Sequence, residues 1–406
     1  MLKKLKNLLY SVIALTLSLF VKRNENYIAF GSWEGKLYLD NSKYLLEYIR
    51  SINDGKYKLF WVGVETILPQ LPEDVVFIKK NSFKSILPLL RCKYMFFSQM
   101  HNADIANFNA FRGAVMVFLN HGICLKKCFT DAAGYSGGLE KKNASFLRKV
   151  YGTIVGTYRK YDYFIAASNY HFDTYLSSCA YLGANRENVL KTGTPRNDVI
   201  ANSTEEQAKC HKIRYAERIG FDSDVKVIMY LPTFRRKTAG VSSLVSGDLE
   251  QRRKLNKILE QYNAVLIEKN HYAADKFAEN NNKTDDFSRL VKLDIEVDIQ
   301  EMLQFTDVMI SDYSGAFMDF LHTDRPIVHY LYDYEYYRDY DSGLYLEKEE
   351  FACGEVAENF DELCAALENA LSGNDENGQL RKRGRKLFVE YECGRSSQKI
   401  FETIIK

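Results

Sequence analysis

The stretch that decides the fold is residues 307–339, DVMISDYSGAFMDFLHTDRPIVHYLYDYEYYRD. It begins with the short apolar run Val308, Met309 and Ile310, which suits a strand covered on both faces. Five residues with small or hydrogen-bonding side chains, 311–315, then interrupt the run. This order, a buried strand followed by a polar turn, is typical of the places where α/β proteins bind a ligand.

A helix and a second strand complete the unit. Apolar residues recur at helical spacing over 316–320, so the turn should lie at a helix N-terminus, where backbone N–H groups and the positive dipole end favour phosphate. The hydroxyls of Ser311 and Ser314 would add donors. Pro326 ends the helix, and residues 327–331 form the next apolar strand of a βαβ unit. An ordinary capped helix without a ligand is the alternative interpretation.

Length and composition narrow the class of protein. A chain of 406 residues is too long for one ordinary core and predicts two domains. The formal net charge of +2 gives no field that would favour nucleic acid as a partner. The eight cysteines form neither a CxxC pair nor a dense disulfide framework, which is typical of reduced thiols in a cytosolic compartment.

Residues 1–24 form a basic and apolar segment of their own. Three lysines precede an apolar run over 8–21, and Lys22 and Arg23 close it. This run makes about 21 Å of helix, short of the roughly 30 Å hydrocarbon core, and no small-x-small cleavage site follows. We therefore expect a helix lying in the inner leaflet, and a peripheral protein on the cytoplasmic face of the cell membrane. Docking of the helix on the protein's own surface is the alternative.

Beyond this helix, strand-like and helix-like segments alternate in two blocks, an N-terminal domain over 25–205 and a C-terminal domain over 206–385. They predict an α/β protein with two Rossmann-like parallel-sheet domains facing a cleft. The polar stretch 202–218 is the expected hinge, and 386–406 should be a helix packing back across the domains. The strand candidates are 27–30, 57–62, 75–78, 94–97, 115–119 and 163–167 in the first block and 225–230, 264–267, 308–310 and 327–331 in the second, where 249–262 is an amphipathic helix.

Three polar clusters follow strands of this scheme. His121 and Gly122 come directly after the strand at 115–119; a histidine there can act as a general base, and the glycine lets a substrate approach the backbone. Arg235 belongs to a run of three cations that can grip phosphate, and His271 follows the next strand. Each has a plainer interpretation as a packed histidine or a solvated basic loop. Because all three follow strand ends, they favour a phosphate-handling cleft.

These motifs resemble the CDP-glycerol glycerophosphotransferase family, the teichoic acid primases and polymerases. Their order and spacing match those of the family, and the resemblance covers nearly everything from residue 26 to about residue 390. The matching segments are FGSWEGKLYLDNSKYL at 30–45, NHGICLKK at 120–127, TGTPRND at 192–198, YLPTFR at 230–235, the segment around His271, and SDYSGAFMDF at 311–320.

The resemblance implies a GT-B-type fold with an acceptor domain followed by a CDP-donor domain. It implies transfer of glycerol phosphate or ribitol phosphate from a CDP donor to a hydroxyl of a membrane-linked glycan or a teichoic or capsular acceptor, with release of CMP. His121 would deprotonate the acceptor, and His271 and Arg235 would neutralise pyrophosphate charge, so that neither a metal nor a resident cofactor is expected. The residues expected at the nucleotide side are Ser311, Asp312, Tyr313, Ser314 and Gly315, and the supporting candidates are Gly122, Lys126, Arg196 and Asp319.

The chain departs from the family pattern at four places. Asn120 stands where an aromatic residue is usual, and Ile123-Cys124 stands where Thr-Pro is usual. Tyr272 replaces a proline, and Gly315 replaces the second serine of the turn. Because the first two changes lie beside His121, the acceptor can be either a teichoic acid linkage unit or a capsule or lipopolysaccharide repeat. Two other classes also stay open: a glycosyltransferase that uses a nucleotide sugar in cell-surface polysaccharide synthesis, and a non-catalytic membrane-associated scaffold.

Overall fold

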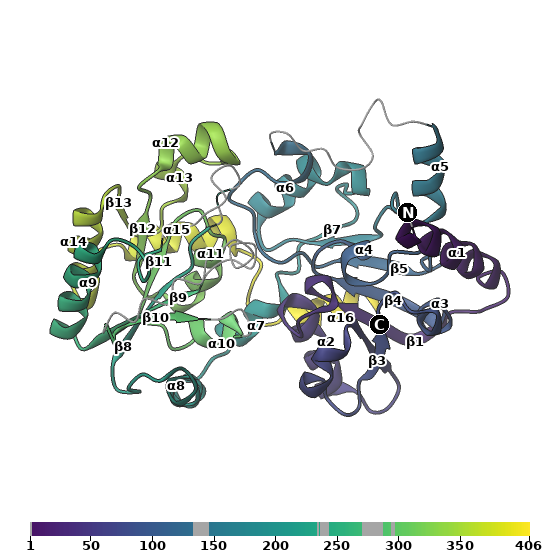
Figure 1. The fold of residues 1–406 in the computed structure, drawn as a ribbon, viewed down its shortest axis with the longest axis horizontal. Coiled ribbons are helices and arrows are strands. Elements are labelled where there is room, and N and C mark those ends of the chain that lie inside the picture. Colours follow the sequence, from purple (N-terminus) through teal and green to yellow (C-terminus); the bar gives the residue numbers. More distant parts are fainter. Residues whose placement is uncertain (1, 133–145, 234, 236–242, 270–286, 294–296) are drawn as a thin grey trace. The chain divides into compact units, whose positions relative to one another are not determined.

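The structure is a computed structural model that describes residues 2–132, 146–233, 235, 243–269, 287–293 and 297–406. The chain forms two compact units, which are drawn in Figure 1. Unit 1 comprises residues 1–121, 129–198 and 391–406, and unit 2 comprises 122–128 and 199–390. The two α/β domains predicted from the alternating pattern are confirmed. The main passage between the units follows residue 198, whereas the sequence pattern puts it after residue 205.

Unit 1 is built on a seven-stranded parallel sheet with the order β3-β2-β1-β4-β5-β6-β7. The first strand lies inside the sheet, and the order reverses between β1 and β4. In open α/β sheets, ligands bind outside the carboxyl ends of the strands at such a switch point. The strands are β1 Asn24–Gly31, β2 Lys58–Gly63, β3 Val76–Lys79, β4 Cys92–Phe97, β5 Val115–Phe118, β6 Tyr163–Ile165 and β7 Val189–Leu190.

Helices cover both faces of this sheet. One face packs against α2 and α16, and the other packs against α1, α3 and α6. Strand residues point alternately to the two faces, and both sets are buried, as expected for a parallel sheet covered on both sides. The helices of unit 1 are α1 Leu2–Leu17, α2 Asp40–Ile52, α3 Ile86–Arg91, α4 His101–Asp104, α5 Phe146–Ile154, α6 Asn169–Ser178 and α16 Ser396–Ile404.

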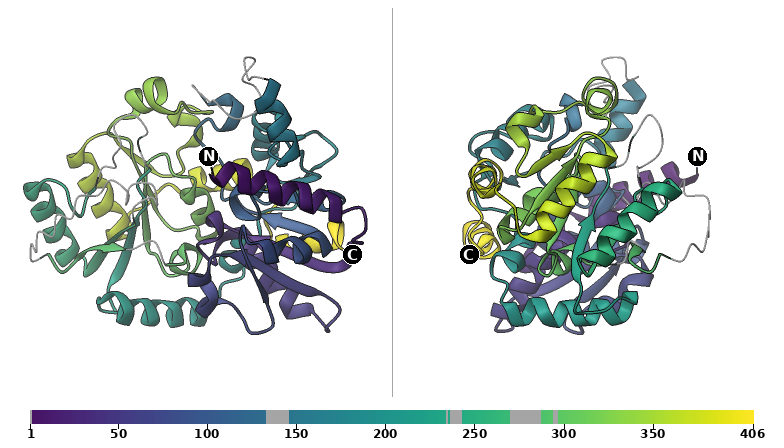
Figure 2. Two further views of the ribbon diagram at one scale, coloured as in Figure 1. Left: turned by 45° about the vertical axis from the view of Figure 1, so that its right-hand side comes forward. Right: turned by 90° about the vertical axis from the view of Figure 1, so that its left-hand side faces the viewer.

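The N-terminal helix α1 docks on unit 1 along one side (Figure 2). It contacts α3 and α5, and its small residues Ser11 and Ala14 are fully buried. After the helix, the Arg23 guanidinium donates to the backbone carbonyls of Arg112 at 2.9 Å and Ala110 at 2.7 Å, so the end of this segment is fixed. Among the helices that the structure describes, none is both long and apolar enough to cross a membrane.

Unit 2 repeats the arrangement with a six-stranded parallel sheet in the order β10-β9-β8-β11-β12-β13. Its switch point lies between β8 and β11. The βαβ unit predicted over 307–339 is confirmed as β11, α11 and β12. The strands are β8 Lys226–Tyr230, β9 Ala264–Lys269, β10 Leu290–Leu293, β11 Val308–Ser311, β12 Ile327–Tyr330 and β13 Glu355–Ala357.

Helices also cover the sheet of unit 2, with α9 and α14 packed on one face. The expected hinge over 202–218 is wrong, because this stretch forms the helix α8. Thr204 and Gln207 form a capping box at its start, and Gly220 ends it in a left-handed conformation with φ 92°. The helices are α7 Asp198–Ala201, α8 Glu205–Ile219, α9 Leu249–Gln261, α10 Ile299–Leu303, α11 Ala316–Phe320, α12 Tyr334–Tyr336, α13 Lys348–Phe351, α14 Phe360–Ser372 and α15 Gly378–Phe388.

Candidate active site

The turn after β11 is organised by a buried carboxylate. Asp312 is fully buried and accepts hydrogen bonds from the Thr233 backbone N–H at 2.8 Å and from its hydroxyl at 2.7 Å. It also accepts the backbone N–H of Ser314 at 3.2 Å. Asp312 therefore joins the ends of the neighbouring strands β8 and β11 at the switch point. Its place in the turn is as predicted, but its oxygens bind the protein itself.

Arg235 lies beneath this turn with 3% of its surface exposed. It donates to Asp312 at 2.7 Å and forms a pair of bonds with Asp333 at 2.8 and 3.0 Å. Two more bonds, to the Tyr332 hydroxyl at 2.8 Å and the Thr233 carbonyl at 2.5 Å, occupy the remaining N–H groups of the five that a guanidinium carries. Burial lowers and the adjacent carboxylates raise the pKa of Arg235, with a net increase. In this arrangement Arg235 holds the turn, and its direct contact with phosphate stays a prediction.

Tyr313 forms part of the same buried assembly. Its ring stacks on Tyr337 with centroids 3.9 Å apart, and its hydroxyl donates to Asp333 at 2.9 Å. The Arg235 guanidinium lies over the ring at 5.0 Å, where the cation meets the negative face of the aromatic system. Burial and the nearby carboxylates raise the pKa of Tyr313. Tyr313 is therefore a buried structural residue of the turn, and its hydroxyl remains neutral at physiological pH.

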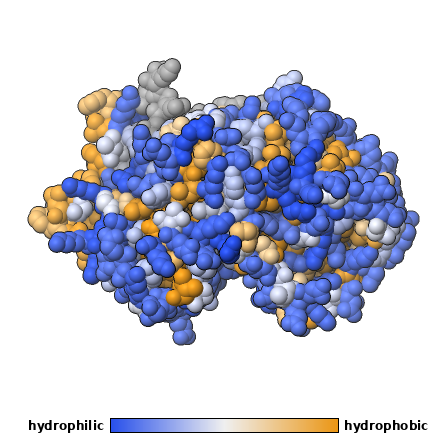
Figure 3. Space-filling model, turned by 180° about the vertical axis from the view of Figure 1, so that it is seen from behind, coloured by the Kyte–Doolittle hydropathy of each residue, from blue (hydrophilic) through white to orange (hydrophobic). Residues whose placement is uncertain are grey.

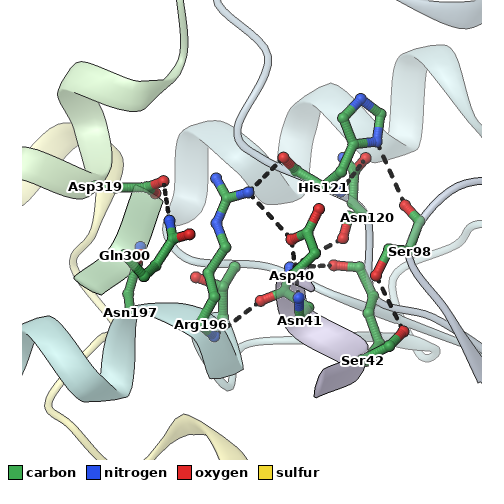
Figure 4. Close-up of polar contacts among 12 residues, drawn as sticks. Asp40, Asn41, Ser42, Ser98, Asn120, His121, Arg196, Asn197, Gln300 and Asp319 are labelled. Atoms are coloured by element: carbon green, nitrogen blue, oxygen red, sulfur yellow. Dashed lines mark hydrogen bonds and ion pairs between the residues drawn. The ribbon is translucent and has the colours of Figure 1, made fainter. Parts of the chain in front are cut away.

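The partly exposed residues of this turn are Ser314 and Gly315. Ser311 is fully buried, with its hydroxyl 3.5 Å from the Ser314 carbonyl. The Ser314 hydroxyl accepts the backbone N–H of Ala316, the first residue of α11, at 3.4 Å. Below the turn, Asp319 is buried and accepts a hydrogen bond from Gln300 at 3.1 Å (Figure 4). Ser314 and Gly315 are therefore the predicted nucleotide-side residues that are open in part to solvent.

In unit 1, His121 lies just beyond the carboxyl end of β5 and has an exposed side chain. Its ring Nδ1 is 3.4 Å from the Ser98 carbonyl, and the ring meets Trp33 edge-on with centroids 5.9 Å apart. The neighbouring backbone is unusual: φ is 56° at Asn120 and 148° at Gly122. Only glycine adopts a positive φ freely, so the surrounding contacts must hold Asn120 in place.

These contacts come from the start of α2 (Figure 4). The Asn41 amide donates to the Leu119 carbonyl at 3.1 Å and to the Asn120 carbonyl at 2.9 Å, and its oxygen accepts the Arg196 backbone N–H at 3.0 Å. The Arg196 guanidinium in turn donates to the His121 carbonyl at 2.5 Å and to Asp40 at 3.2 Å. The supporting candidate Arg196 thus meets the catalytic candidate His121. The sequence reasoning missed Asp40 and Asn41, although a polar pair at the start of an amphipathic helix was a usable signal.

The segment that directly follows His121 in the chain, residues 122–128, belongs to unit 2. Lys126 forms an isolated antiparallel β-bridge with Leu344. On either side of the bridge, the Lys127 N–H donates to the Gly343 carbonyl at 2.9 Å and the Tyr345 N–H donates to the Leu125 carbonyl at 3.1 Å. We call residues 122–128 the linking segment. The supporting candidates Gly122 and Lys126 lie in it.

Three expectations from the sequence concern His271, metal ions and the cysteines. His271 lies outside the described residues, so its predicted role beside the pyrophosphate stays a prediction. Within the described parts of the chain, no group of three histidine, cysteine, aspartate or glutamate side chains could hold a metal ion. All eight cysteines are free thiols.

Comparison with known proteins identifies the family. Residues 13–406 match the family described as CDP-Glycerol:Poly(glycerophosphate) glycerophosphotransferase. The chain is 28% identical to a teichoic acid glycerol-phosphate transferase of Staphylococcus aureus, covering 99% of both chains. It is 27% identical to a teichoic acid poly(glycerol phosphate) polymerase of Bacillus spizizenii, covering 98% of this chain and 96% of that one.

Solved structures share the fold. The wall teichoic acid polymerase TagF superposes with a TM-score of 0.73 at 20% identity, covering 99% of this chain and 97% of that chain. A variant of TagF soaked with CDPG gives a TM-score of 0.77 and covers 99% of this chain and 95% of that chain, again at 20% identity. The family match across almost the whole sequence goes further than this likeness of fold. The chain belongs to the CDP-glycerol:poly(glycerophosphate) glycerophosphotransferase family.

Proposed function

We propose that this protein transfers an alditol phosphate, glycerol phosphate or ribitol phosphate, from a CDP-activated donor to a hydroxyl of a membrane-linked glycan or a teichoic or capsular acceptor. The leaving product is CMP. The observation that carries the proposal is the exposed His121, fixed at the end of β5 by a buried network, in a chain that matches this transferase family over residues 13–406.

His121 is the proposed general base. Donation from Nδ1–H to the Ser98 carbonyl, 3.4 Å away, makes Nε2 the basic nitrogen of the ring. Nε2 would take the proton of the acceptor hydroxyl as its oxygen attacks the distal phosphorus of the donor. The new P–O bond forms while the bridging P–O bond to the cytidine phosphate breaks, and the electron pair leaves with CMP. The proton then passes from the imidazolium to solvent.

The turn over 311–315 is the proposed donor site. The Ser314 hydroxyl and the backbone N–H of Gly315, the two partly exposed residues of the turn, would donate to a phosphate. Arg235, buried just behind them with the carboxylates of Asp312 and Asp333, keeps these donors in place. The donor itself carries the activated phosphate, so the proposal needs no resident cofactor. His271 would add positive charge beside the pyrophosphate.

Nucleotide release tests the proposal directly. The purified protein is offered CDP-glycerol, CDP-ribitol and a panel of nucleotide sugars, each with and without a membrane fraction that supplies the acceptor. The expected result is CMP release from one of the CDP-alditols that increases with the acceptor. Release of a nucleoside diphosphate from a nucleotide sugar would instead identify a glycosyltransferase, and no release from any donor would identify a scaffold.

We also propose that α1 and α5 bind the inner leaflet of the cell membrane, on its cytoplasmic face. The two helices contact each other, and the Tyr151 hydroxyl of α5 donates to the Lys4 carbonyl of α1 at 3.3 Å. On α1, Leu2 and Leu5 are 83% and 63% exposed, and on α5, Phe146 and Leu147 are both 78% exposed. Figure 3 shows a hydrophobic patch over this part of unit 1. The same helix α1 carries the exposed Lys3, Lys4 and Lys6, which anionic headgroups would attract.

Sedimentation with anionic phospholipid vesicles tests this surface. Substitution of serine for Leu2, Leu5 and Leu9 should weaken binding, because these side chains are exposed and their loss leaves the buried side of α1 intact. A control variant carries Leu68→Ser and Ile213→Ser, two exposed apolar residues elsewhere on the chain, and should bind like the unaltered protein. Unchanged binding by the α1 variant would refute the membrane surface.

A further inference from the structure

Gly315 is the residue of the donor turn that differs from the family pattern, and its surroundings explain why a side chain is absent. Its φ of −64° is ordinary for any residue, so backbone conformation does not require glycine. The requirement is space: a Cβ at this position would lie 2.4 Å from the backbone carbonyl oxygen of Ile123. Real Cβ atoms do not approach an oxygen closer than about 3.0 Å, and a carbonyl cannot rotate away as a flexible side chain can.

Ile123 belongs to the linking segment, which is held at a second place by residues 343–345. The bonds from the Lys127 N–H to Gly343 and from the Tyr345 N–H to Leu125 fasten its far end. The near end of the linking segment lies against Gly315, and Ile123 itself is 3% exposed. Two of the departures from the family pattern, Gly315 in place of serine and Ile123-Cys124 in place of Thr-Pro, therefore meet at a single contact.

We propose that Gly315 is a positioning residue that lets the linking segment seat closely on unit 2 and thereby fixes the chain immediately after His121. Its catalytic consequence rests on the proposed function. With any side chain at 315, the Ile123 carbonyl must retreat from 2.4 Å to at least 3.0 Å. Ile123 is only two residues from His121, so part of this shift reaches the base. Misplacement of a catalytic group by about 1 Å can cost about a hundredfold in rate.

The matched pair of variants is Gly315→Ala and Gly378→Ala. Gly378 is the first residue of α15, it has no positive φ, and its added methyl would meet nothing closer than the Arg381 guanidinium at 3.8 Å. Both variants add one methyl to a glycine at a helix start. Only the first should disturb the linking segment.

Amide hydrogen exchange of the full chain measures how firmly the linking segment packs on unit 2, and it needs no substrate. In Gly315→Ala, the amides of Lys127 and Tyr345 should exchange about tenfold faster than in the unaltered protein, because their hydrogen bonds join the linking segment to residues 343–345 and the methyl displaces that segment at Ile123. In Gly378→Ala they should be unchanged. Unchanged exchange in Gly315→Ala would overturn the proposal. Should that variant fail to fold, Tyr345→Phe, which removes a hydroxyl that accepts the Cys128 N–H at 3.4 Å, tests the far end of the same seat by the same measurement.

Steady-state kinetics then tests the consequence for His121. We expect kcat of Gly315→Ala to fall about ten- to a hundredfold while KM for the CDP donor changes less than about threefold, because the methyl points at Ile123 and the N–H of residue 315 is retained. A raised KM with unchanged kcat would assign Gly315 to donor binding and overturn the positioning role. If the unaltered protein transfers from no CDP donor, the proposed function fails, whereas the exchange experiment still decides whether Gly315 seats the segment.

Discussion

The turn after β5 and the turn after β11 both lie at the carboxyl end of a parallel strand, yet they present opposite groups to solvent. After β5, the ionisable side chain of His121 is exposed, and neighbouring amide and guanidinium groups bind its backbone. After β11, the ionisable Asp312 is buried against Arg235, and the uncharged Ser314 and Gly315 are the partly exposed residues. An ionisable residue of a motif is therefore exposed in one turn, where we propose that it acts on the acceptor, and buried in the other, where it holds the backbone.

The sharpest test of this contrast removes the exposed side chain. His121→Ala should lower the rate of CMP release by about a hundred- to ten-thousandfold, the range expected for a general base, with CDP binding retained. The measurements are single-turnover CMP release and calorimetric titration with CDP. The control His211→Ala removes a histidine from α8 and should leave the rate unchanged. Transfer at the original rate by His121→Ala would refute the base assignment.

Removing the buried charge of Asp312 should lower the free energy of unfolding. Asp312→Asn leaves Arg235 without its closest carboxylate partner, and breaking a buried ion pair costs about 3–5 kcal/mol of the free energy of unfolding. Urea denaturation followed by circular dichroism measures the loss. Asp339→Asn, which alters an exposed aspartate in the same unit, should change the value by less than about 0.5 kcal/mol. Equal values for the two variants would mean that Asp312 does not organise the turn.

A third variant loosens the backbone beneath His121. Asn41→Ala removes the bonds to the carbonyls of Leu119 and Asn120, and leaving such buried groups unsatisfied costs about 1–3 kcal/mol. We expect kcat to fall about tenfold with the donor KM unchanged, since the base shifts while the donor turn is untouched. Asn53→Ala, at the other end of α2, breaks two bonds to Tyr57 and should lower stability without lowering kcat. A common drop of kcat in both variants would contradict this separation.

The smallest effect is a pH dependence of stability that comes from unit 2. His329 is buried and its Nε2 accepts the Cys353 N–H at 3.1 Å; burial lowers its pKa from 6.5 to about 3. Between these values the unfolded chain binds a proton that the folded chain refuses, so stability is complete above pH 6.5 and falls as the pH is lowered towards 3. The slope for this one group is about 1.4 kcal/mol per pH unit. Urea denaturation at pH 7.5 and 5.5 should show a smaller difference for His329→Gln, and an equal difference would show that His329 does not contribute.

Much of the fold follows from short-range patterns in the sequence. The ten predicted strands correspond to β1–β6, β8, β9, β11 and β12, because each contains a short apolar run. The sequence pattern missed β7, β10 and β13. These strands have two to four residues and include the outermost members of both sheets, where burial is less complete. The helix α8 was also missed, although Thr204 and Gln207 form a capping box that the sequence shows.

The candidate site was only partly predictable. Motif order and strand ends located His121 and the turn over 311–315, because both depend on where strands stop. The burial of Arg235 could not be inferred, since Asp333 and Tyr332, which engage it, are almost a hundred residues away in the chain. The contact of Gly315 with Ile123 spans an even longer separation. Such long-range contacts decide whether a polar residue faces a ligand or the protein.

Each unit is made of segments that are not contiguous in the chain, and this constrains how the enzyme can be divided or recombined. The chain passes from one unit to the other after residues 121, 128, 198 and 390. A fragment ending at residue 198 would lack α16, whose Ile400 and Phe401 complete the core beneath α2. The remaining fragment would lack residues 122–128. Neither half is a portable module, so a chimera that exchanges unit 2 must join 199–390 at both of its ends and bring the matching linking segment with it.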